Sequence, residues 1–352
     1  MLKNRKVLKI TLIVVVALLF VFSVGSMIFS KSDYDRNFKR VDPPQYTGLL
    51  RYQDVSGYDR TVVNFNSGDN QLAGYIYGAE NQKGLVVISH GLGYGAEDYL
   101  AETLYFVDQG WRVFAFDNTG TYESQGKNER GLPQSVIDLD AALTYIENDP
   151  TFNDLPVVLW GHSWGGYAVA AVLNFDHPVA AVVSVAGFDS PNGLLMEQAK
   201  SQLGLLGYLE YPFLSAYQSF LFGGKAKLTA VNGINHSDTP VMIVHGTADE
   251  SISYTGASII SHRDDITNPN VIYKTYSAEN HNGHKSLLRS DAAVKYIDKI
   301  NQEYKALFNR YNGAIPEDVN AAFYAGLDKF QTSELDENLM REMNAFFERQ
   351  IH

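Results

Sequence analysis

The chain has 352 residues, of which 45% are hydrophobic, enough for a sizeable core in one large domain with additions. Its formal net charge of -12 argues against a partner such as nucleic acid, whose phosphates attract basic surfaces. The absence of cysteine excludes disulfides, thiolate chemistry and zinc–thiolate sites, and it leaves the cellular compartment open.

An uncharged, apolar run over residues 10–29 follows a basic N-terminus. At about 1.5 Å per helical residue, this run reaches about 30 Å, the thickness of the hydrocarbon core of a bilayer. We therefore expect residues 1–32 to form a transmembrane anchor. The alternative is a cleaved signal peptide, because Ser23-Val24-Gly25 fits a small-x-small cleavage site, although apolar residues continue beyond it.

Basic residues flank the apolar run on both sides, so the positive-inside rule predicts no orientation. Both alternatives export the body of the protein, which we expect to be extracytoplasmic: membrane-anchored, or secreted if the N-terminus is cleaved. Residues 33–53 are polar and contain Pro43-Pro44, which predicts a linker. The folded domain is then expected to occupy residues 54–352.

Strand-like and helical patterns alternate from residue 54 onward. Residues 61–65 and 72–77 predict a hairpin, and later apolar runs predict strands at 84–90, 111–117, 156–160, 179–188, 241–246 and 271–277. Helices are predicted at residues 97–110, 135–149 and 166–175. Runs of β-branched residues without alternating polarity are typical of strands covered on both faces, which predicts an α/β fold with a mostly parallel, doubly wound sheet.

Two segments interrupt this alternation. Residues 189–239 are too long for an ordinary connection and are rich in Leu, Tyr and Phe, which predicts a helical cap over the sheet edge. After about residue 290, a helical period predicts a C-terminal extension to residue 352 with a packing role. There, Ser333 and Asp336 resemble a capping box before the last helix.

The pentapeptide Gly161-His162-Ser163-Trp164-Gly165 fits the pattern G-x-S-x-G between a predicted strand and a predicted helix. The glycines allow a strained turn that would collide with larger side chains, and the helix N-terminus directs free N–H groups to an oxyanion beside the serine. Ser163 is therefore the candidate nucleophile. A glycine-rich turn with a passive serine is the alternative.

A serine hydroxyl needs a base, and the base needs a carboxylate to orient it. Asp249 follows a buried strand, and both His281 and His284 follow the next one, in the order serine, acid, histidine. We expect Asp249 and His284 to complete the triad, since Gly283 leaves room for the imidazole of His284. Asp189 is the alternative acid and His281 the alternative base.

The stretch from Ser89 to Tyr99 contains the loop expected to supply the other half of an oxyanion hole. The candidate donors are the backbone N–H groups of Leu92 and Trp164. The histidine pair at 281 and 284 lacks neighbouring carboxylate or cysteine partners, so we expect no metal.

Two hypotheses from other classes compete with catalysis. Gly91, Gly93 and Ala96, with Asp117 ending the next strand, imitate a dinucleotide-binding fingerprint. That interpretation leaves Ser163, Asp249 and His284 unexplained and has a hairpin before its first strand. The other alternative is a non-catalytic, membrane-tethered binding module.

The ordered motifs SHGLGYG, FDNTGTYESQG, GHSWGGY, VHGTADES and NGHKS resemble α/β-hydrolases of the serine aminopeptidase and lysophospholipase-like branch. The resemblance implies an eight-stranded sheet, a cap inserted after strand six, no cofactor and acyl transfer by a serine esterase or peptidase. Together with the anchor, the apolar cap favours a hydrophobic or lipid-like ester as the small-molecule substrate. A peptide substrate of a serine aminopeptidase is the alternative; the sequence predicts no oligomeric state.

Overall fold

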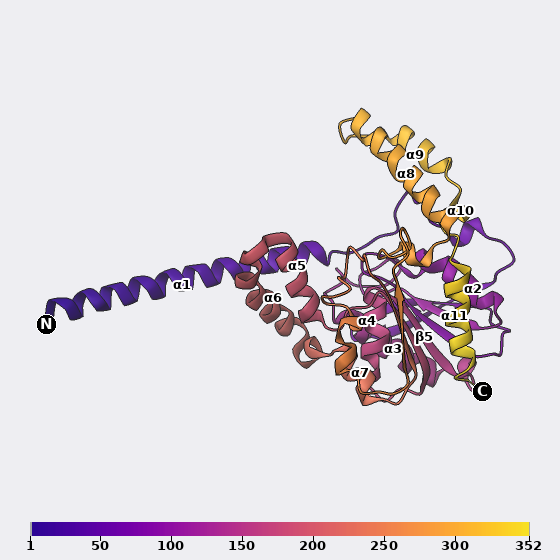
Figure 1. Ribbon diagram of the computed structural model, residues 1–352, viewed down its shortest axis with the longest axis horizontal. Helices are drawn as coiled ribbons and strands as arrows, with labels where there is room; N and C mark the ends of the chain where they lie inside the picture. The colour runs from indigo at the N-terminus through magenta and orange to yellow at the C-terminus, as the bar shows by residue number, and fades with distance from the viewer. Residues whose placement is uncertain (1, 352) are drawn as a thin grey trace.

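The computed structural model describes residues 2–351, and it describes side chains from residue 6 onward. Its centre is an eight-stranded sheet of order β1-β2-β4-β3-β5-β6-β7-β8 (Figure 1). The strands are β1 (Arg60–Ser67), β2 (Asn70–Tyr77), β3 (Leu85–Ser89), β4 (Arg112–Phe116), β5 (Val157–His162), β6 (Val179–Val185), β7 (Val241–Gly246) and β8 (Val271–Tyr276). Strands β3 to β8 are parallel, whereas β2 pairs antiparallel with β1 and β4. The predicted hairpin and mostly parallel sheet are therefore confirmed.

The α-helices are α1 (Leu2–Asn37), α2 (Leu100–Asp108), α3 (Gln134–Asn148), α4 (Trp164–Ala171), α5 (Pro191–Leu203), α6 (Gly207–Phe222), α7 (Ala230–His236), α8 (Asp291–Arg310), α9 (Glu317–Ala325), α10 (Lys329–Thr332) and α11 (Glu337–Glu348). Short 3-10 helices are η1 (Tyr52–Asp54), η2 (Ala96–Tyr99), η3 (Pro150–Phe152), η4 (Val172–Asn174), η5 (Gly204–Leu206), η6 (Gly223–Lys227), η7 (Ile259–Asp265) and η8 (Ser286–Leu288).

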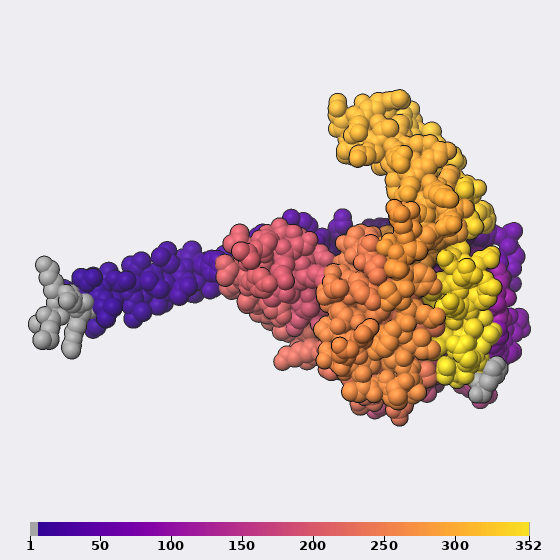
Figure 2. Space-filling view, in the orientation of Figure 1, coloured from indigo at the N-terminus to yellow at the C-terminus, as the bar shows by residue number. Residues whose placement is uncertain are grey.

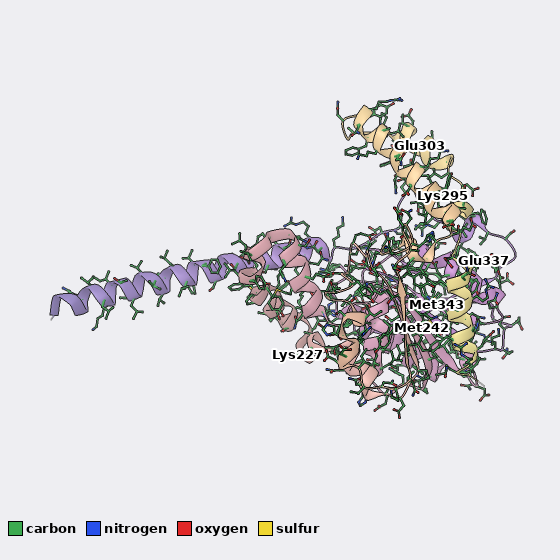
Figure 3. All side chains as sticks on the ribbon, viewed as in Figure 1. Lys227, Met242, Lys295, Glu303, Glu337 and Met343 are labelled. Atoms are coloured by element: carbon green, nitrogen blue, oxygen red, sulfur yellow. The ribbon has the colours of Figure 1, made fainter. Side chains whose placement is uncertain are left out.

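Helices cover both faces of the sheet, as the unbroken apolar strands require. Because side chains alternate along a strand, Val87 packs with α3, α4 and α7, while the adjacent Val86 packs with α2 and α11 on the other face. Met242 of β7 and Met343 of α11 belong to this second layer (Figure 3). The two helical layers make the sheet rigid, and the candidate site lies at the ends of its strands.

The segment between β6 and β7, expected to be a cap, divides into two parts. Helices α5 and α6 pack on each other, and α6 also packs along α1. Helix α7 instead packs on α4 within the helical layer of the body. Only the first part of residues 189–239 therefore stands apart from the sheet, beside α1 (Figure 1).

Helix α1 continues without a break to Asn37, past the point where a linker was expected. Tyr34 and Phe38 lie four residues apart and are 2% and 4% exposed. Their rings pack on each other, and the ring of Tyr34 also packs on that of Tyr217 in α6. Leu50 is also buried. The structure therefore differs from the predicted linker: residues 33–53 are partly core. Among the described residues, the segment Lys6–Asn37 is long and apolar enough to cross a membrane.

The C-terminal extension has two different parts. Helices α8 and α9 form an arm that projects from the body, whereas α11 returns to the sheet (Figures 1 and 2). The predicted capping box is wrong: Asp336 itself caps α11 by accepting a hydrogen bond from the Leu339 N–H at 2.8 Å. The Ser333 hydroxyl instead accepts the backbone N–H of Leu50 at 3.0 Å, which ties the extension to the start of the body.

Candidate active site

Strand β5 and helix α4 are joined by Ser163, whose backbone is strained. Its φ of 59° and ψ of -115° lie in a region that L-residues rarely occupy. A Cβ atom at Gly161 would collide with the Gly165 carbonyl, and one at Gly165 would collide with the carbonyl of Ser89. Glycine is therefore required on both sides, and the sharp turn presents the serine at the N-terminus of α4.

Asp249 and His284 meet at the ends of neighbouring strands β7 and β8. His284 Nδ1 lies 2.8 Å from Asp249 Oδ2, and both side chains are buried. The other carboxylate oxygen accepts the backbone N–H groups of Ser251 and Ile252 at 2.9 and 2.8 Å. Burial alone would raise the pKa of Asp249, but the hydrogen bonds from histidine and backbone hold it well below its ordinary value. The carboxylate is thus charged and fixed in orientation.

Ser163 and His284 line the same cavity, which has a volume of about 400 Å³. In the part of the chain that the structure describes, no hydrogen bond joins the serine hydroxyl to a protein group. Catalytic hydrogen bonds are often long in unliganded sites and shorten when substrate binds. The side chains therefore share the space in which an ester would react.

Two backbone donors face this cavity from the expected positions. Leu92 follows β3, and Trp164 is the first residue of α4, where a helix has no acceptor of its own for the N–H group. Within residues 2–351, neither of these N–H groups has a protein acceptor, whereas the adjacent Gly91 and Gly93 donate to Tyr99 Oη and Glu129 Oε1. The free pair is suited to receive an oxyanion.

The two alternative residues point elsewhere. His281 Nε2 contacts the carboxylate of Asp291, and His281 is not among the residues that line the cavity of Ser163. Asp189 Oδ1 accepts the backbone N–H of Val231 at 2.9 Å, at the start of α7. The structure thus brings Asp249, rather than Asp189, to the imidazole of His284.

A second histidine contacts the candidate acid, and the sequence analysis did not predict it. His245, at the end of β7, is fully buried, and its Nε2 lies 3.1 Å from Asp249 Oδ2 and 3.0 Å from the Ile252 carbonyl. Because both neighbours are acceptors, the proton of this imidazole is on Nε2. A histidine four residues before the acid, at a strand end, was the available signal.

A buried hydrogen-bonded chain links the three loops of the site. The Gly91 N–H donates to Tyr99 Oη at 3.1 Å, and this hydroxyl donates to His162 Nδ1 at 2.8 Å. His162 Nε2 donates in turn to the backbone carbonyl of His284 at 2.9 Å. Burial, together with the nearby His284, lowers the pKa of His162 to about 3, so its imidazole stays neutral and keeps this tautomer. These hydrogen bonds hold together the loop after β3, the turn that carries Ser163 and the loop that carries His284.

Residues of the alternative dinucleotide-binding fingerprint make hydrogen bonds within the protein. Asp117 is fully buried, accepting the Ala96 N–H and the Tyr75 hydroxyl, both at 2.7 Å. His90 occupies the turn, donating from Nδ1 to the Gly91 carbonyl at 2.8 Å and accepting the Asn118 N–H at 2.9 Å. These contacts stabilise the loop and leave the carboxylate of Asp117 unavailable to a ribose hydroxyl. Among the described residues, no cluster of three or more His, Asp or Glu side chains is placed to hold a metal.

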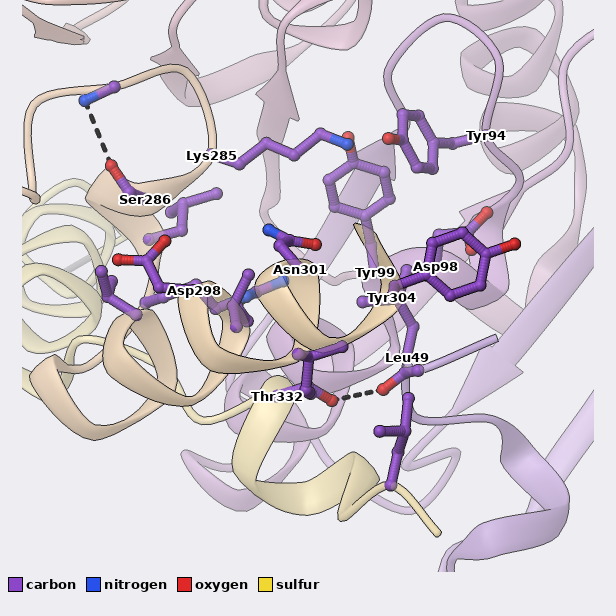
Figure 4. A pocket seen from close by; sticks show the side chains of 18 of the residues that line it. Leu49, Tyr94, Asp98, Tyr99, Lys285, Ser286, Asp298, Asn301, Tyr304 and Thr332 are labelled. Atoms are coloured by element: carbon purple, nitrogen blue, oxygen red, sulfur yellow. Dashed lines mark hydrogen bonds between the residues drawn. The ribbon is translucent and has the colours of Figure 1, made fainter. Parts of the chain in front are cut away.

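A second cavity, of about 710 Å³, adjoins the first beneath the arm formed by α8 and α9. Tyr94, Tyr99, His162 and Lys285 line both cavities. In Figure 4 the Lys285 side chain extends toward the rings of Tyr94 and Tyr99, and its Nζ lies 4.1 Å from the centre of the Tyr94 ring. The site thus has an apolar cavity on the α1 side and a more polar one on the arm side.

Comparisons with known proteins identify the same architecture. Residues 80–209 match the family model described as serine aminopeptidase, S33. The quorum-quenching protein AidA of Acinetobacter baumannii is 30% identical over 131 residues, which are 36% of this chain and 43% of that protein. A polyketide transferase of Penicillium, grgF, is 28% identical over 136 residues, which are 38% and 46% of the two chains. The chain thus spans less than half the length of these curated relatives.

Solved structures resemble a larger part of the chain. The Pyrococcus furiosus esterase Pf2001 is 20% identical with a TM-score of 0.52, over 79% of this chain and 100% of that one. The GrgF crystal structure is 17% identical with a TM-score of 0.51, over 72% and 98% of the two chains. At such identities the likeness concerns the fold, and it confirms the expected α/β-hydrolase architecture.

Proposed function

We propose that this chain, which has the α/β-hydrolase fold, is a serine hydrolase that cleaves carboxylic esters through an acyl-enzyme on Ser163. The observation that carries the proposal is the buried contact of His284 Nδ1 with Asp249 Oδ2 at 2.8 Å, in a cavity shared with Ser163. The two free N–H groups of Leu92 and Trp164 support it further.

The proposed reaction proceeds in two halves. His284 Nε2 accepts the proton of the Ser163 hydroxyl while the oxygen attacks the ester carbonyl carbon, and the N–H groups of Leu92 and Trp164 stabilise the oxyanion. The C–O bond to the alcohol then breaks, and the imidazolium returns the proton to the departing alcohol. Water, deprotonated by the same imidazole, attacks the acyl-enzyme and releases the acid and the free serine. Asp249 stabilises the imidazolium in both halves.

The proposed substrate is a hydrophobic or lipid-like ester. Apolar side chains of α5 and α6 line the cavity of Ser163, and further ones come from α1 and the residue after it: Leu194, Leu195, Leu203, Leu214, Phe29, Tyr34 and Phe38. Such a lining favours an acyl chain over a charged peptide. A serine aminopeptidase is the second candidate, favoured by the description of the matching family model. We further propose that α1 anchors the chain in a membrane with the body extracytoplasmic.

Labelling with a fluorophosphonate probe tests the nucleophile. The wild-type chain should be labelled and Ser163→Ala should not, while Ser251→Ala, which removes another hydroxyl from the same cavity, should be labelled normally. Labelling of Ser163→Ala at the wild-type level would refute the assignment. Turnover of p-nitrophenyl esters of increasing chain length, against aminoacyl anilides, then separates the two candidates: cleavage of anilides alone would favour the peptidase.

A further inference from the structure

Helices α1 and α6 lie side by side and run in the same direction. The Ser26 hydroxyl donates to Glu210 Oε1 at 3.0 Å, and the Tyr34 hydroxyl donates to Gln218 Oε1 at 3.4 Å. The rings of Phe22 and Phe213 also meet, with their centres 6.0 Å apart, so the contact on α1 extends from Phe22 to Tyr34. Figure 1 shows α5 and α6 against the C-terminal part of α1.

This contact places an apolar turn alongside the proposed anchor. The turn between α5 and α6 carries four exposed side chains, hereafter the cap tip: Leu205, Leu206, Tyr208 and Leu209. Glu210, the residue directly after the cap tip, bonds Ser26, and Phe213 contacts Phe22, so the cap tip lies beside the apolar run near its end. Ser26 lies three residues inside Phe29, the end of the apolar run, which is about 4.5 Å along a helix.

The composition of the cap tip suits a membrane interface. Leu205 is 84% exposed and Leu206 is 63% exposed, and clustered apolar exposure of this kind marks an interaction surface. The Nζ atom of Lys200 lies 5.2 Å from the centre of the Tyr208 ring at the edge of the turn. Aromatic and basic side chains of this kind are enriched where apolar surface meets lipid headgroups.

The catalytic cavity extends toward the same place. Its lining includes Ser163, Phe29, the last residue of the apolar run, and Leu203 of α5, two residues before the cap tip. One cavity therefore reaches from the nucleophile to the level at which α1 would leave the hydrocarbon. A lipid in the leaflet beside α1 would meet its apolar wall.

We propose that the cap tip inserts into the membrane leaflet beside α1 and that the catalytic cavity takes its ester substrate directly from that leaflet. A depth of about 5 Å agrees with the 5–10 Å typical of interfacial apolar segments. This proposal rests on the anchor and hydrolase functions proposed above. Its partner is the lipid bilayer rather than another protein.

Because the chain has no cysteine, single cysteines can be introduced and labelled with a nitroxide. Leu206→Cys probes the cap tip. Phe220→Cys is the matched control, since Phe220 is an 82% exposed apolar residue of α6 that follows Gln218, the partner of Tyr34, and therefore lies beyond the apolar run. The full chain is reconstituted into phosphatidylcholine–phosphatidylglycerol vesicles, and spin relaxation by oxygen is compared with that by a water-soluble nickel complex.

The label at 206 should collide with oxygen at least about fivefold more effectively, relative to nickel, than the label at 220, because oxygen concentrates in hydrocarbon. Equal nickel accessibility of the two labels in vesicles would overturn the docking surface. Spin–spin broadening at 206, persisting in detergent, would also overturn it by showing that a second copy covers the turn.

An activity measurement tests the route of the substrate. The double variant Leu205→Asp, Leu206→Asp should hydrolyse a long-chain ester embedded in vesicles at least about tenfold more slowly than wild type, since charges in hydrocarbon are costly. Its turnover of soluble p-nitrophenyl acetate should stay normal, and Phe220→Asp should retain both activities. Unchanged vesicle hydrolysis by the double variant would refute the route. Failure of wild type on both esters would refute the hydrolase proposal, while the nitroxide result decides the docking surface independently.

Discussion

His245 and His284 meet on one oxygen of the candidate acid: their Nε2 and Nδ1 atoms lie 3.1 and 2.8 Å from Asp249 Oδ2. His245 therefore restrains the carboxylate that orients the base. We expect His245→Leu to lower kcat about tenfold by loosening Asp249, with a smaller effect on KM. His245→Gln, whose amide can still donate to the carboxylate, should restore most of the rate. Equal turnover by the wild type and the two variants would exclude a positioning role for His245.

The acid is identified by comparing two aspartates. Asp249→Asn would hold His284 in the wrong tautomer and should lower kcat/KM by about 10⁴-fold. Asp189→Asn, which alters a carboxylate that accepts the Val231 N–H at the start of α7, should cost far less. Steady-state hydrolysis of a p-nitrophenyl ester measures both, and the reverse ranking would move the acid to the end of β6.

The base is tested in the same manner. His284→Gln removes the imidazole that contacts Asp249, so hydrolysis should fall by about 10³-fold or more. His281→Gln removes a histidine paired with Asp291 outside the cavity and should remain close to wild type. A larger loss in the second variant would contradict the assignment.

The Tyr99 hydroxyl is a structural link with two partners. Tyr99→Phe leaves the Gly91 N–H and His162 Nδ1 unpaired in a buried place, which should lower the free energy of unfolding by about 1–3 kcal/mol. Tyr94→Phe, in the neighbouring ring, is the control. Chemical denaturation compares the two, and equal stability of the Tyr99 and Tyr94 variants would count against the link.

Glu129 makes stability depend on pH. Burial raises the pKa of Glu129 from its ordinary value of 4.5 to about 7, even though the carboxylate accepts the Gly93 N–H. The folded chain therefore binds the proton more tightly than the unfolded chain, and this group lowers the free energy of unfolding as the pH rises from 4.5 to about 7. Glu129→Gln should be more stable than wild type above pH 7, by up to about 3 kcal/mol, with the difference vanishing below pH 4.5.

Thermal or denaturant unfolding across that range measures the difference between the two chains, so that other titrating groups cancel. A constant difference at every pH would show that Glu129 does not carry the effect.

Local patterns predicted the parts of the site that depend on the sheet. Ser163, Asp249 and His284 each follow a strand whose β-branched run is visible in the sequence, and parallel strands bring their carboxyl ends to one edge. The choice between His281 and His284 was harder, because both lie in one loop. The contact of His284 with Asp249 depends on the path of that loop after β8, and the hydrophobic periodicity of the sequence does not predict the path of a loop.

Long-range contacts account for what the sequence did not predict. In the sequence, His245 looks like one more residue of a buried strand. Its contact with Asp249 forms only when the loop after β7 folds back on the strand. Likewise, Tyr34 and Phe38 stand in a polar stretch, and their burial depends on α6, which lies about 180 residues later in the chain. Pro43-Pro44 did mark an irregular segment, but not a detached one.

Helix α1 combines two properties that a single cut could separate. The residues that line the catalytic cavity begin at Phe29, and the hydrogen bond to α6 begins at Ser26, both beyond the small-residue site at Gly25. A chain shortened there would lose most of the apolar run that we propose as an anchor and retain the wall of the cavity. For the anchored hydrolase proposed above, such a cut would change where the substrate is met without removing the cavity in which it reacts.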